Sequence, residues 1–202
     1  MSEIETFPVV VATGNQHKIA EIEFTLKALV ETWVVLQPFS GKLPPENGET
    51  FEENALIKAR AAFRATGLPS IADDSGICVD SLGGEPGIRS ARYTEEGTDA
   101  ANLKALLENT KGHKKRDATF VCAVALVSRN EEAVVRGEWR GAIRTSAKGE
   151  GGFGYDPIFV PNGMEQTAAE LSRLEKAALS HRGRALGMIA PAINRLVAGS
   201  RG

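Results

Sequence analysis

The sequence has few of the residues that mark several large classes of protein. Its 202 residues include only two cysteines, Cys78 and Cys122, and neither lies in a Cys-x-x-Cys or Cys/His pattern. This spacing offers no cysteine-based zinc site and no disulfide framework, and it predicts two buried, reduced thiols. No apolar run approaches the roughly 18 residues that cross a bilayer. The chain starts with an acidic segment, unlike a signal peptide, so we expect a soluble, cytoplasmic protein.

An excess of positive charge is also absent. The 24 lysines and arginines are balanced by 26 acidic residues, which gives a net charge of −2 and a pI near 6.0. The chain therefore lacks a global basic surface for nucleic acid. The basic stretch from Lys111 to Arg116 leaves a nucleic-acid-binding α/β domain as one hypothesis, but the acidic pI favours a solvated connection there.

What is present is a globular composition with alternating strand and helix patterns. The hydrophobic fraction is 42% and the charged fraction 25%, which suits one large domain or two close-packed lobes. A β-branched run at residues 7–13 breaks at Gly14, and residues 33–37 predict a second strand. Between them, apolar residues recur at helical spacing at Ile19, Ile22, Leu26 and Leu29. This order indicates a β-α-β unit.

Capping residues and apolar runs predict the remaining elements. Helices are predicted over residues 51–64, 98–107 and 167–177, beginning at the caps Thr50, Thr98 and Thr167. Strands are predicted at residues 118–128 and 132–143, paired as a hairpin, and at residues 156–161. The last helix carries an apolar stripe, with a kink expected at Pro191, formed by Leu186, Ile189, Ile193 and Leu196. The interleaving predicts a mixed α/β sheet.

The first pattern with chemical meaning is "ATGNQHK" at residues 12–18. A glycine turn between a strand and a helix exposes backbone N–H groups at the positive end of the helix dipole, where phosphate binds. Thr13, Asn15 and Lys18 add two short polar side chains and an ammonium group. The segment is neither a Walker A loop nor a G-x-G-x-x-G turn. An ordinary βα turn capped near Asn15 has the same pattern.

The second pattern is acidic. Asp73 and Asp74 end an apolar run, and residues 75–76 are expected to form a turn. Adjacent residues of an extended chain point to opposite sides, so only one of the two carboxylates would face a given cleft. Glu46 or Glu49 would add another oxygen ligand, and such a set suits Mg²⁺. A turn flanked by solvated acids is the alternative.

The third pattern is cationic. Ser180 is expected to cap the last helix, which puts His181 and Arg182 in its first turn, where cations oppose the helix dipole. An anion or a polar ligand would offset that cost, and Lys176 lies close by in sequence. Lys58 is a further candidate, on a helix expected to be exposed. Ordinary surface cations are the alternative for all four residues.

The fourth pattern is the loop "GFGYDP" at residues 152–157. Phe153, Tyr155 and Asp156 offer a stacking face, a hydroxyl and a carboxylate, which together suit a flat polar ligand. The glycines leave room where another group comes close. A tight loop with no ligand also explains these residues.

The order of these patterns resembles the family of inosine/xanthosine triphosphate pyrophosphatases, also called the Ham1-like family of non-canonical purine nucleoside-triphosphate pyrophosphatases. The resemblance extends from about Val9 to Leu196. It rests on "ATGNQHK", "ENGETFEENALIKA", "ADDSG" with "LGGEPGIRSARY", "GGFGYDPIF" and "AELSRLEKAALSHRG".

The resemblance implies a fold and an activity. The expected fold is α/β, with a long mixed central sheet flanked by helices, in a single domain over residues 1–202 with two lobes and a nucleotide cleft between them. The expected enzyme is a cytoplasmic, Mg²⁺-dependent homodimer that hydrolyses ITP, dITP and XTP to the monophosphate and diphosphate. A regulatory nucleotide-binding module without turnover is the alternative, and Asp74 beside an acidic loop argues against it.

The resemblance also implies roles for individual residues. Asp74 would be the catalytic proton acceptor and would bind Mg²⁺ together with Glu46, with Glu49 as the alternative. The residues expected at the phosphates and nearby are Thr13, Gly14, Asn15, Lys18, Lys58 and Ser75. Those expected to line the base and sugar site are Phe153, Gly154, Tyr155, Asp156, Lys176, His181 and Arg182.

Base selectivity would follow from hydrogen-bond donors. His181 and Arg182 would donate to the 6-oxo group of hypoxanthine or xanthine, whereas adenine presents an amino donor at that position. A buried donor left unpaired costs roughly 1–3 kcal/mol. The glycines of residues 149–154 would keep Cβ atoms away from the nucleotide, so Gly152→Val is expected to weaken substrate binding more than folding.

Overall fold

The structure is a computed structural model that describes residues 6–199. Its strands are β1 (Phe7–Val11), β2 (Val34–Pro38), β3 (Ser70–Val79), β4 (Asp117–Val127), β5 (Glu132–Ile143) and β6 (Phe159–Pro161). Its α-helices are α1 (Gln16–Leu26), α2 (Phe51–Thr66), α3 (Asp99–Asn109), α4 (Arg173–Leu179) and α5 (His181–Gly199). Four 3₁₀ helices are η1 (Asp80–Leu82), η2 (Gly87–Arg92), η3 (Asp156–Ile158) and η4 (Ala168–Glu170).

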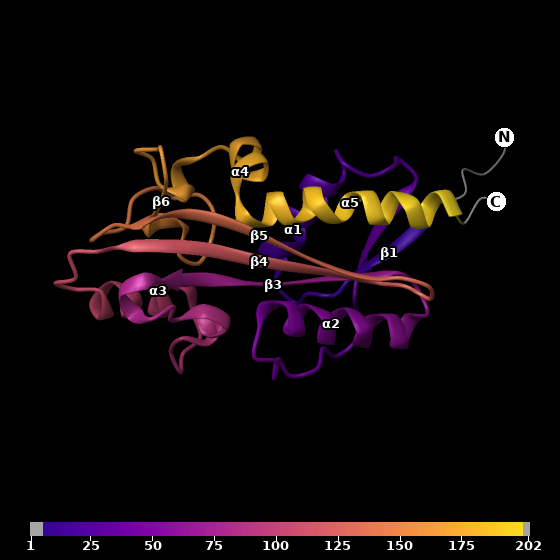
Figure 1. The fold of residues 1–202 in the computed structure, drawn as a ribbon, viewed down its shortest axis with the longest axis horizontal. Helices are drawn as coiled ribbons and strands as arrows, with labels where there is room; N and C mark the ends of the chain where they lie inside the picture. Colours follow the sequence, from indigo (N-terminus) through magenta and orange to yellow (C-terminus); the bar gives the residue numbers. More distant parts are fainter. Residues whose placement is uncertain (1–5, 200–202) are drawn as a thin grey trace. The chain divides into compact units, whose positions relative to one another are not determined.

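The six strands form one mixed sheet in the order β2-β1-β3-β4-β5-β6 (Figure 1). Strand β1 is parallel to both β2 and β3, whereas β5 and β6 are antiparallel. The register places Val9 beside Leu36. The predicted β-α-β unit at the start of the chain is thus confirmed, as is the mixed α/β class.

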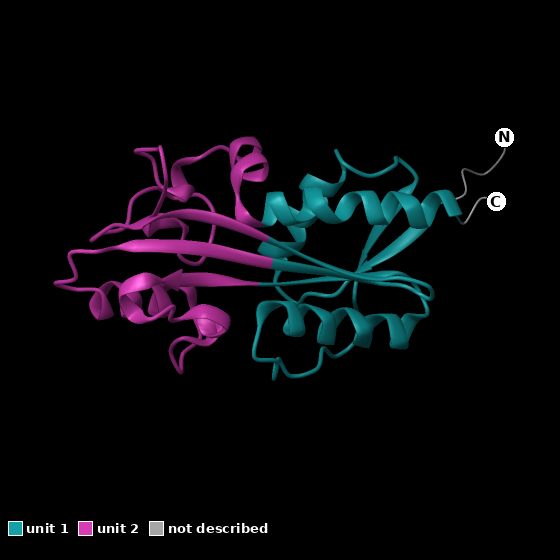
Figure 2. Cartoon of the chain, viewed as in Figure 1, with its two compact units in different colours: residues 1–74, 123–136, 182–202 teal, residues 75–122, 137–181 magenta. Residues whose placement is uncertain are grey.

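Contacts divide the chain into two compact units (Figure 2). The first unit comprises the residues up to Asp74, residues 123–136 and the chain from Arg182 onward; the second comprises residues 75–122 and 137–181. The divisions fall inside β3, β4 and β5, so each of these strands contributes residues to both units.

In the first unit, α1 and α5 cover one face of the sheet and α2 covers the opposite face (Figure 1). The buried apolar residues of these helices include Ile22, Leu26, Ala55, Ala59, Leu186, Ile189 and Ile193. Helix α1 ends at Leu26, and Leu29 beyond it is 40% exposed, so the predicted apolar stripe is one residue too long. Burial of the apolar residues of α1, α2 and α5 away from water stabilises the packing of these helices on the sheet.

The second unit has its own apolar core. Its largest members are Ile77, Leu106, Phe120, Trp139, Ile143, Tyr155, Ile158 and Phe159. The predicted cap of α3 is confirmed, because the Thr98 hydroxyl accepts a hydrogen bond from Ala101 N at 3.2 Å. In the described chain, no helix combines the length and apolarity needed to cross a membrane. Both cysteines are thiols, with Cys122 buried and Cys78 half-buried.

The predicted turn at residues 75–76 is wrong, because β3 continues through it to Val79. Gly76 suits this stretch of strand because it lacks a Cβ. A Cβ there would collide with the Gly87 carbonyl and the Ser90 hydroxyl. The Ser90 hydroxyl occupies the space left by the missing Cβ. It accepts a hydrogen bond from Ile77 N at 2.9 Å, which holds the strand in place.

The predicted continuous helix after Thr167 is also wrong. Only the short helix η4 follows Thr167, and Leu171 is extended with φ −77° and ψ 146°. A second capping box then starts α4, in which the Glu175 carboxylate accepts a hydrogen bond from Ser172 N at 2.9 Å. The S-x-x-E pattern therefore restarts the chain as a separate helix.

We predict that Gly76→Ala lowers the free energy of unfolding by about 1–3 kcal/mol, because the added methyl group overpacks a buried strand. Gly187→Ala is the matched control, since Gly187 lies in α5 and a Cβ there meets no atom within 4 Å. Alanine at position 187 should stabilise the helix by about 0.5–1 kcal/mol. Urea titrations of both variants measure these changes, and equal stability of the two variants would contradict the prediction.

Candidate active site

The turn between β1 and α1 is held by its own side chains. Asn15 is the N-cap of α1, and its Oδ1 accepts hydrogen bonds from His17 N at 2.9 Å and Lys18 N at 3.2 Å. Thr13 is buried and its hydroxyl accepts a hydrogen bond from Asn15 N at 3.3 Å. Gly14 is exposed, and a Cβ there would meet nothing within 4 Å. The capped βα turn is confirmed, and phosphate binding at it stays a prediction.

The two neighbouring aspartates of β3 are both buried and point to different partners. Asp73 Oδ2 lies 3.2 Å from Lys18 Nζ and 3.0 Å from Arg182 Nη2. Asp74 Oδ2 instead accepts a hydrogen bond from Asn54 Nδ2 at 3.1 Å. The alternation of an extended chain explains this, since Asp73 meets residues of α1 and α5 and Asp74 meets α2 on the opposite face (Figure 1).

Asp73 is ionised despite its complete burial. Burial alone would raise its pKa, but the charges of Lys18, Arg182 and Lys58 hold the pKa well below the ordinary value of 3.8. A buried carboxylate is stable in this form only when cations and hydrogen bonds compensate it. Asp73 is therefore a fixed anion that organises the cations around it.

Asp74 has the opposite electrostatic character. Burial raises the pKa of this carboxyl group, Glu46 and Asp73 raise it further, and Lys58 and Lys18 only partly offset the rise. A carboxylate with a raised pKa is a stronger proton acceptor. Of the two aspartates, Asp74 is thus the one suited to general-base chemistry.

Lys58 lies between the acidic loop and Asp74. Its Nζ is 2.6 Å from Glu46 Oε1 and 3.7 Å from Asp74 Oδ1. The expectation of an exposed helix position is wrong, because Lys58 is only 3% exposed on the sheet-facing side of α2. Burial opposes its charge, but Asp73, Asp74 and Glu46 raise its pKa above 10.5, so the ammonium group is retained.

The residues around Lys58 fit a magnesium ion. Glu46 and Asp74 direct carboxylate oxygens toward the same ammonium group, so this region already accommodates a cation. Among the described residues, no group of three or more histidine, cysteine or acidic side chains has metal-binding geometry. Two carboxylates with the remaining positions left to water and phosphate are typical of Mg²⁺.

Arg182 is committed to two carboxylates. Its guanidinium group is 2% exposed and pairs with Glu21 at 2.5 Å as well as with Asp73. Sequence reasoning missed Glu21, because the partners are 161 positions apart and no local pattern joins them. The structure brings Lys18, Asp73, Arg182 and Glu21 into one network, in which Asp73 and Arg182 are buried and Lys18 and Glu21 are half-buried.

A second group of predicted residues gathers in the loop before η3. The Asp156 carboxylate accepts hydrogen bonds from Phe153 N at 2.8 Å and from Lys176 Nζ at 2.5 Å. Lys176 Nζ also lies 5.0 Å from the centre of the Phe153 ring. Gly154 N donates to Asp99 Oδ2 at 2.8 Å, which ties the loop to the start of α3. The loop therefore presents a half-buried aromatic ring beside a cation.

Tyr155 is a buried member of the apolar core of the second unit. Its hydroxyl group donates to the Ser90 carbonyl at 2.8 Å, and burial raises the pKa of Tyr155 well above 10. His181 is likewise buried, and its ring stacks on Phe120 at 4.7 Å with an interplanar angle of 7°. Trp139 flanks the same imidazole at 6.4 Å.

The glycines of this loop make room for the chain itself. A Cβ at Gly152, which has φ +69°, would collide with the Asp156 carboxylate. A Cβ at Gly151 would lie 2.7 Å from the Ala169 carbonyl oxygen. The expectation that Gly152 keeps a Cβ away from the nucleotide is therefore wrong, and Gly152→Val is expected to weaken folding as well as binding, since valine combines backbone strain with a clash inside the loop.

Comparison with known protein families decides the classification. The Ham1 family matches residues 9–192.

The chain belongs to the Ham1 family. A dITP/XTP pyrophosphatase from Mycobacterium tuberculosis (strain ATCC 25618 / H37Rv) is 50% identical over 198 residues, covering 95% of this chain and 97% of the relative. The dITP/XTP pyrophosphatase of Escherichia coli O157:H7 is 46% identical over 191 residues, covering 92% and 97%.

Solved structures agree with this membership. A HAM1 protein from Coxiella burnetii has a TM-score of 0.83 at 39% identity, over 94% of this chain and 100% of that one. A nucleoside-triphosphatase, or dITP/XTP pyrophosphatase, from Mycobacterium abscessus has a TM-score of 0.73 at 46% identity, over 92% and 100%. Membership of the Ham1 family is thus supported by sequence and by fold.

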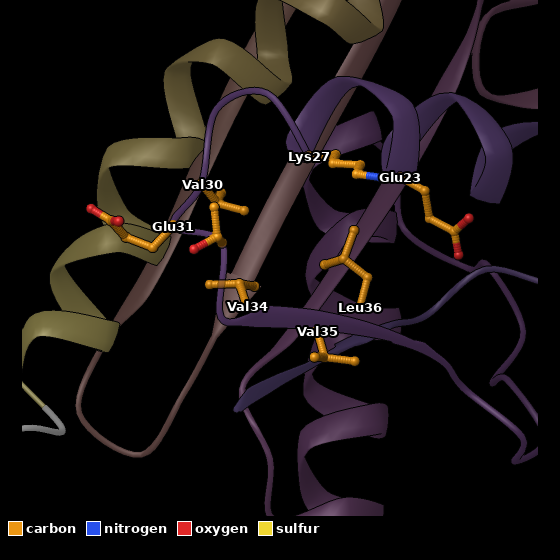
Figure 3. Close-up of a pocket in the computed structure, with 8 residues that line it drawn as sticks. Glu23, Lys27, Val30, Glu31, Val34, Val35 and Leu36 are labelled. Atoms are coloured by element: carbon orange, nitrogen blue, oxygen red, sulfur yellow. The ribbon is translucent and has the colours of Figure 1, made fainter. Parts of the chain in front are cut away.

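One pocket of this Ham1-family chain contains none of the predicted site residues. It measures about 420 Å³ and lies beside the end of α1 and strand β2 (Figure 3). Its lining combines Lys27 and Glu31 with apolar Val30, Val34 and Leu36. None of the residues that the family resemblance assigns to phosphate, metal or base lines this pocket.

We predict that Asp73→Asn destabilises the protein by about 3–5 kcal/mol near neutral pH, because it leaves buried cations without their anion. The folded-state pKa of Asp73 is lowered, so its stabilising effect is complete above the ordinary value of 3.8 and is lost as the pH falls below it. Urea titrations of both proteins should therefore give a constant difference from pH 8 to pH 5 that shrinks below pH 4. Asp80→Asn, at an exposed position, is the control. A difference that already shrinks between pH 8 and pH 5 would contradict the assignment.

Proposed function

We propose that this chain is a nucleoside-triphosphate pyrophosphatase that hydrolyses the non-canonical purine nucleotides ITP, dITP and XTP to the monophosphate and diphosphate. The names of its relatives support this, at 50% and 46% identity over almost the whole chain. The observation that carries the proposal is Asp74, a buried carboxylate with a raised pKa that faces Lys58 and Glu46.

The first step is to bind a polyanion. Lys18, in the first turn of α1, supplies an ammonium group next to the turn that contains Thr13, Gly14 and Asn15, and Lys58 of α2 supplies a second one beside Asp74. The exposed Gly14 lets phosphate oxygens approach the backbone closely, at the positive end of α1. Each lysine now pairs with a carboxylate, so the phosphates would share these cations with Asp73 and Glu46.

The second step is attack of water on the α-phosphorus. Asp74 accepts a proton from the water while the oxygen of that water forms a bond to the α-phosphorus. The bond from the α-phosphorus to the bridging oxygen breaks, and diphosphate leaves with that oxygen. Ser75 follows Asp74 directly in β3 and is proposed to contact the substrate. The energetic contribution of the protein is mainly positioning and charge stabilisation.

Glu46 and Asp74 are the residues that we propose to hold Mg²⁺. When bound, Mg²⁺ would lower the pKa of a coordinated water and neutralise charge on the departing diphosphate. Glu46 is favoured over Glu49 because the Glu46 carboxylate contacts Lys58 at 2.6 Å, on the side of Asp74. Glu49 is exposed, and its backbone N–H donates to Glu53 Oε2 at 2.6 Å.

We assign binding of the purine base to the second group of residues, in and around the loop before η3. Phe153 offers a stacking face, and Gly154 and Asp156 shape the loop that presents it. We propose that Lys176 and His181 supply donors toward the 6-oxo group, which adenine lacks, whereas the Tyr155 hydroxyl is already bonded to Ser90. We assign Arg182 an indirect role, in which it holds Asp73 and thereby Lys18.

The cytoplasmic location, the single domain over residues 1–202 and the homodimer stay predictions from the family resemblance. The thiol form of both cysteines supports a reducing compartment. The Ham1 match over residues 9–192 supports one continuous evolutionary unit.

The activity is tested by incubating the purified protein with ITP, dITP, XTP and the standard nucleotides in the presence of Mg²⁺. Diphosphate and monophosphate should form in equal amounts from the first three substrates, and much more slowly from ATP. Excess EDTA should stop turnover, and added Mg²⁺ should restore it. Release of orthophosphate in place of diphosphate would refute the bond assignment, and absence of turnover would refute the enzyme.

We predict that Asp74→Asn reduces kcat for dITP by about 10²–10⁴-fold, the usual contribution of general-base catalysis. Binding of dITP should remain measurable by calorimetry, because the cations that face the phosphates are unchanged. Asp80→Asn, an exposed position in η1, should keep full activity as a control. If Asp74→Asn retains normal turnover, another residue is the base.

A further inference from the structure

Asn54 connects the proposed general base with the acidic loop. It is 0% exposed in α2, and its Nδ2 donates to Asp74 Oδ2 at 3.1 Å. Its Oδ1 accepts a hydrogen bond from Gly48 N at 2.9 Å. Gly48 lies two residues after Glu46, so one amide group contacts both the catalytic carboxylate and the loop that carries its partner.

The chemistry of the two contacts determines the orientation of the Asn54 amide. An ionised carboxylate only accepts hydrogen bonds, and a backbone N–H only donates. The amide NH₂ must therefore face Asp74 and the amide oxygen must face Gly48. The amide of Asn54 thus supplies a donor and an acceptor in two different directions from one side chain.

The loop is shaped to reach this amide. A Cβ at Gly48 would lie 2.9 Å from Asn54 Oδ1 and 2.7 Å from Glu53 Cβ, so a larger residue would push the loop away. Glu49 N donates to Glu53 Oε2 at 2.6 Å, which fastens the next residue of the loop to α2. The close approach of the loop to α2 is thus secured at Gly48 and at the residue that follows it.

Asn54 and Lys58 are four residues apart and occupy the same buried side of α2. Lys58 joins Glu46 to Asp74 through its ammonium group, and Asn54 joins the backbone of the same loop to the other oxygen of Asp74. One turn of helix therefore sets the direction of the Asp74 carboxylate at both of its oxygens. Lys58 would be shared with phosphate when substrate binds, which leaves Asn54 as the contact that persists.

We propose that Asn54 is a positioning residue that holds the Asp74 carboxylate in the orientation needed to accept a proton from water. The inference rests on the proposed function, because it assigns Asn54 a role in that reaction. Without the amide, the carboxylate is free to turn about its side-chain bonds and the loop loses one of its contacts with α2. Misplacement of a catalytic group by about 1 Å costs on the order of 100-fold in rate.

The test uses two substitutions of Asn54 in the full chain. Asn54→Ala removes both hydrogen bonds, whereas Asn54→Asp keeps the oxygen that accepts from Gly48 and removes the donor to Asp74. Both should lower kcat for dITP about 100-fold while KM changes less than about threefold. Asn54→Asp preserves the side-chain volume, so it remains informative if the alanine variant does not fold.

Asn102→Ala is the matched control for loss of a buried amide. Asn102 is 2% exposed in α3, accepts a hydrogen bond from Thr94 N at 2.9 Å and donates to the Ala91 carbonyl at 3.1 Å. Neither Thr94 nor Ala91 has a part in the proposed reaction. Its substitution should lower the melting temperature about as much as Asn54→Ala does, while kcat stays within about threefold of the parent protein.

The outcomes separate this inference from the proposed function. A parent protein without turnover of dITP would refute the function and the role of Asn54 together. An active parent protein whose Asn54 variants keep kcat within threefold would refute the positioning role alone. Equal loss of kcat in Asn54→Ala and Asn102→Ala, measured below both melting temperatures, would show that the effect is structural and would also refute it.

Discussion

Two adjacent buried carboxylates in β3 determine how the surrounding elements of the first unit must be arranged. Because successive side chains of a strand point to opposite faces, Asp73 and Asp74 make their direct contacts with different residues, although Lys18 and Lys58 act on the pKa of both. Each buried charge needs its own compensation, since an unpaired one costs several kcal/mol. Asp73 obtains it from Lys18 of α1 and Arg182 of α5, and Asp74 from residues of α2.

This arrangement gives the two aspartates different chemistry. Cations surround Asp73 and lower its pKa, so it stays a permanent anion that orders the residues beside the β1–α1 turn. Asp74 has a raised pKa and retains the proton affinity that a general base requires. The same physical terms, burial and nearby charge, thus shift the pKa values of two neighbouring aspartates in opposite directions.

Local features were predicted correctly where the determining interactions lie within a few residues. The Asn15 and Thr98 caps and the β-α-β unit depend on neighbours in sequence, and the structure confirms them. The turn at residues 75–76 was predicted wrongly. Gly76 is required because Gly87 and Ser90 approach the strand closely, and the chain does not change direction there. The loop at residues 152–157 was recognised, but the purpose of Gly152 was not, since it accommodates Asp156 of the loop itself.

The sequence by itself determined the class of fold and the family, because motif order and periodicity are properties of the chain. Only the tertiary structure decided which charges meet. The burial of Lys58, the pairing of Arg182 with Glu21 and the contact of Asn54 with Asp74 join residues that are distant in sequence. These contacts depend on which helix packs on which face of β3, and the local sequence does not specify that packing.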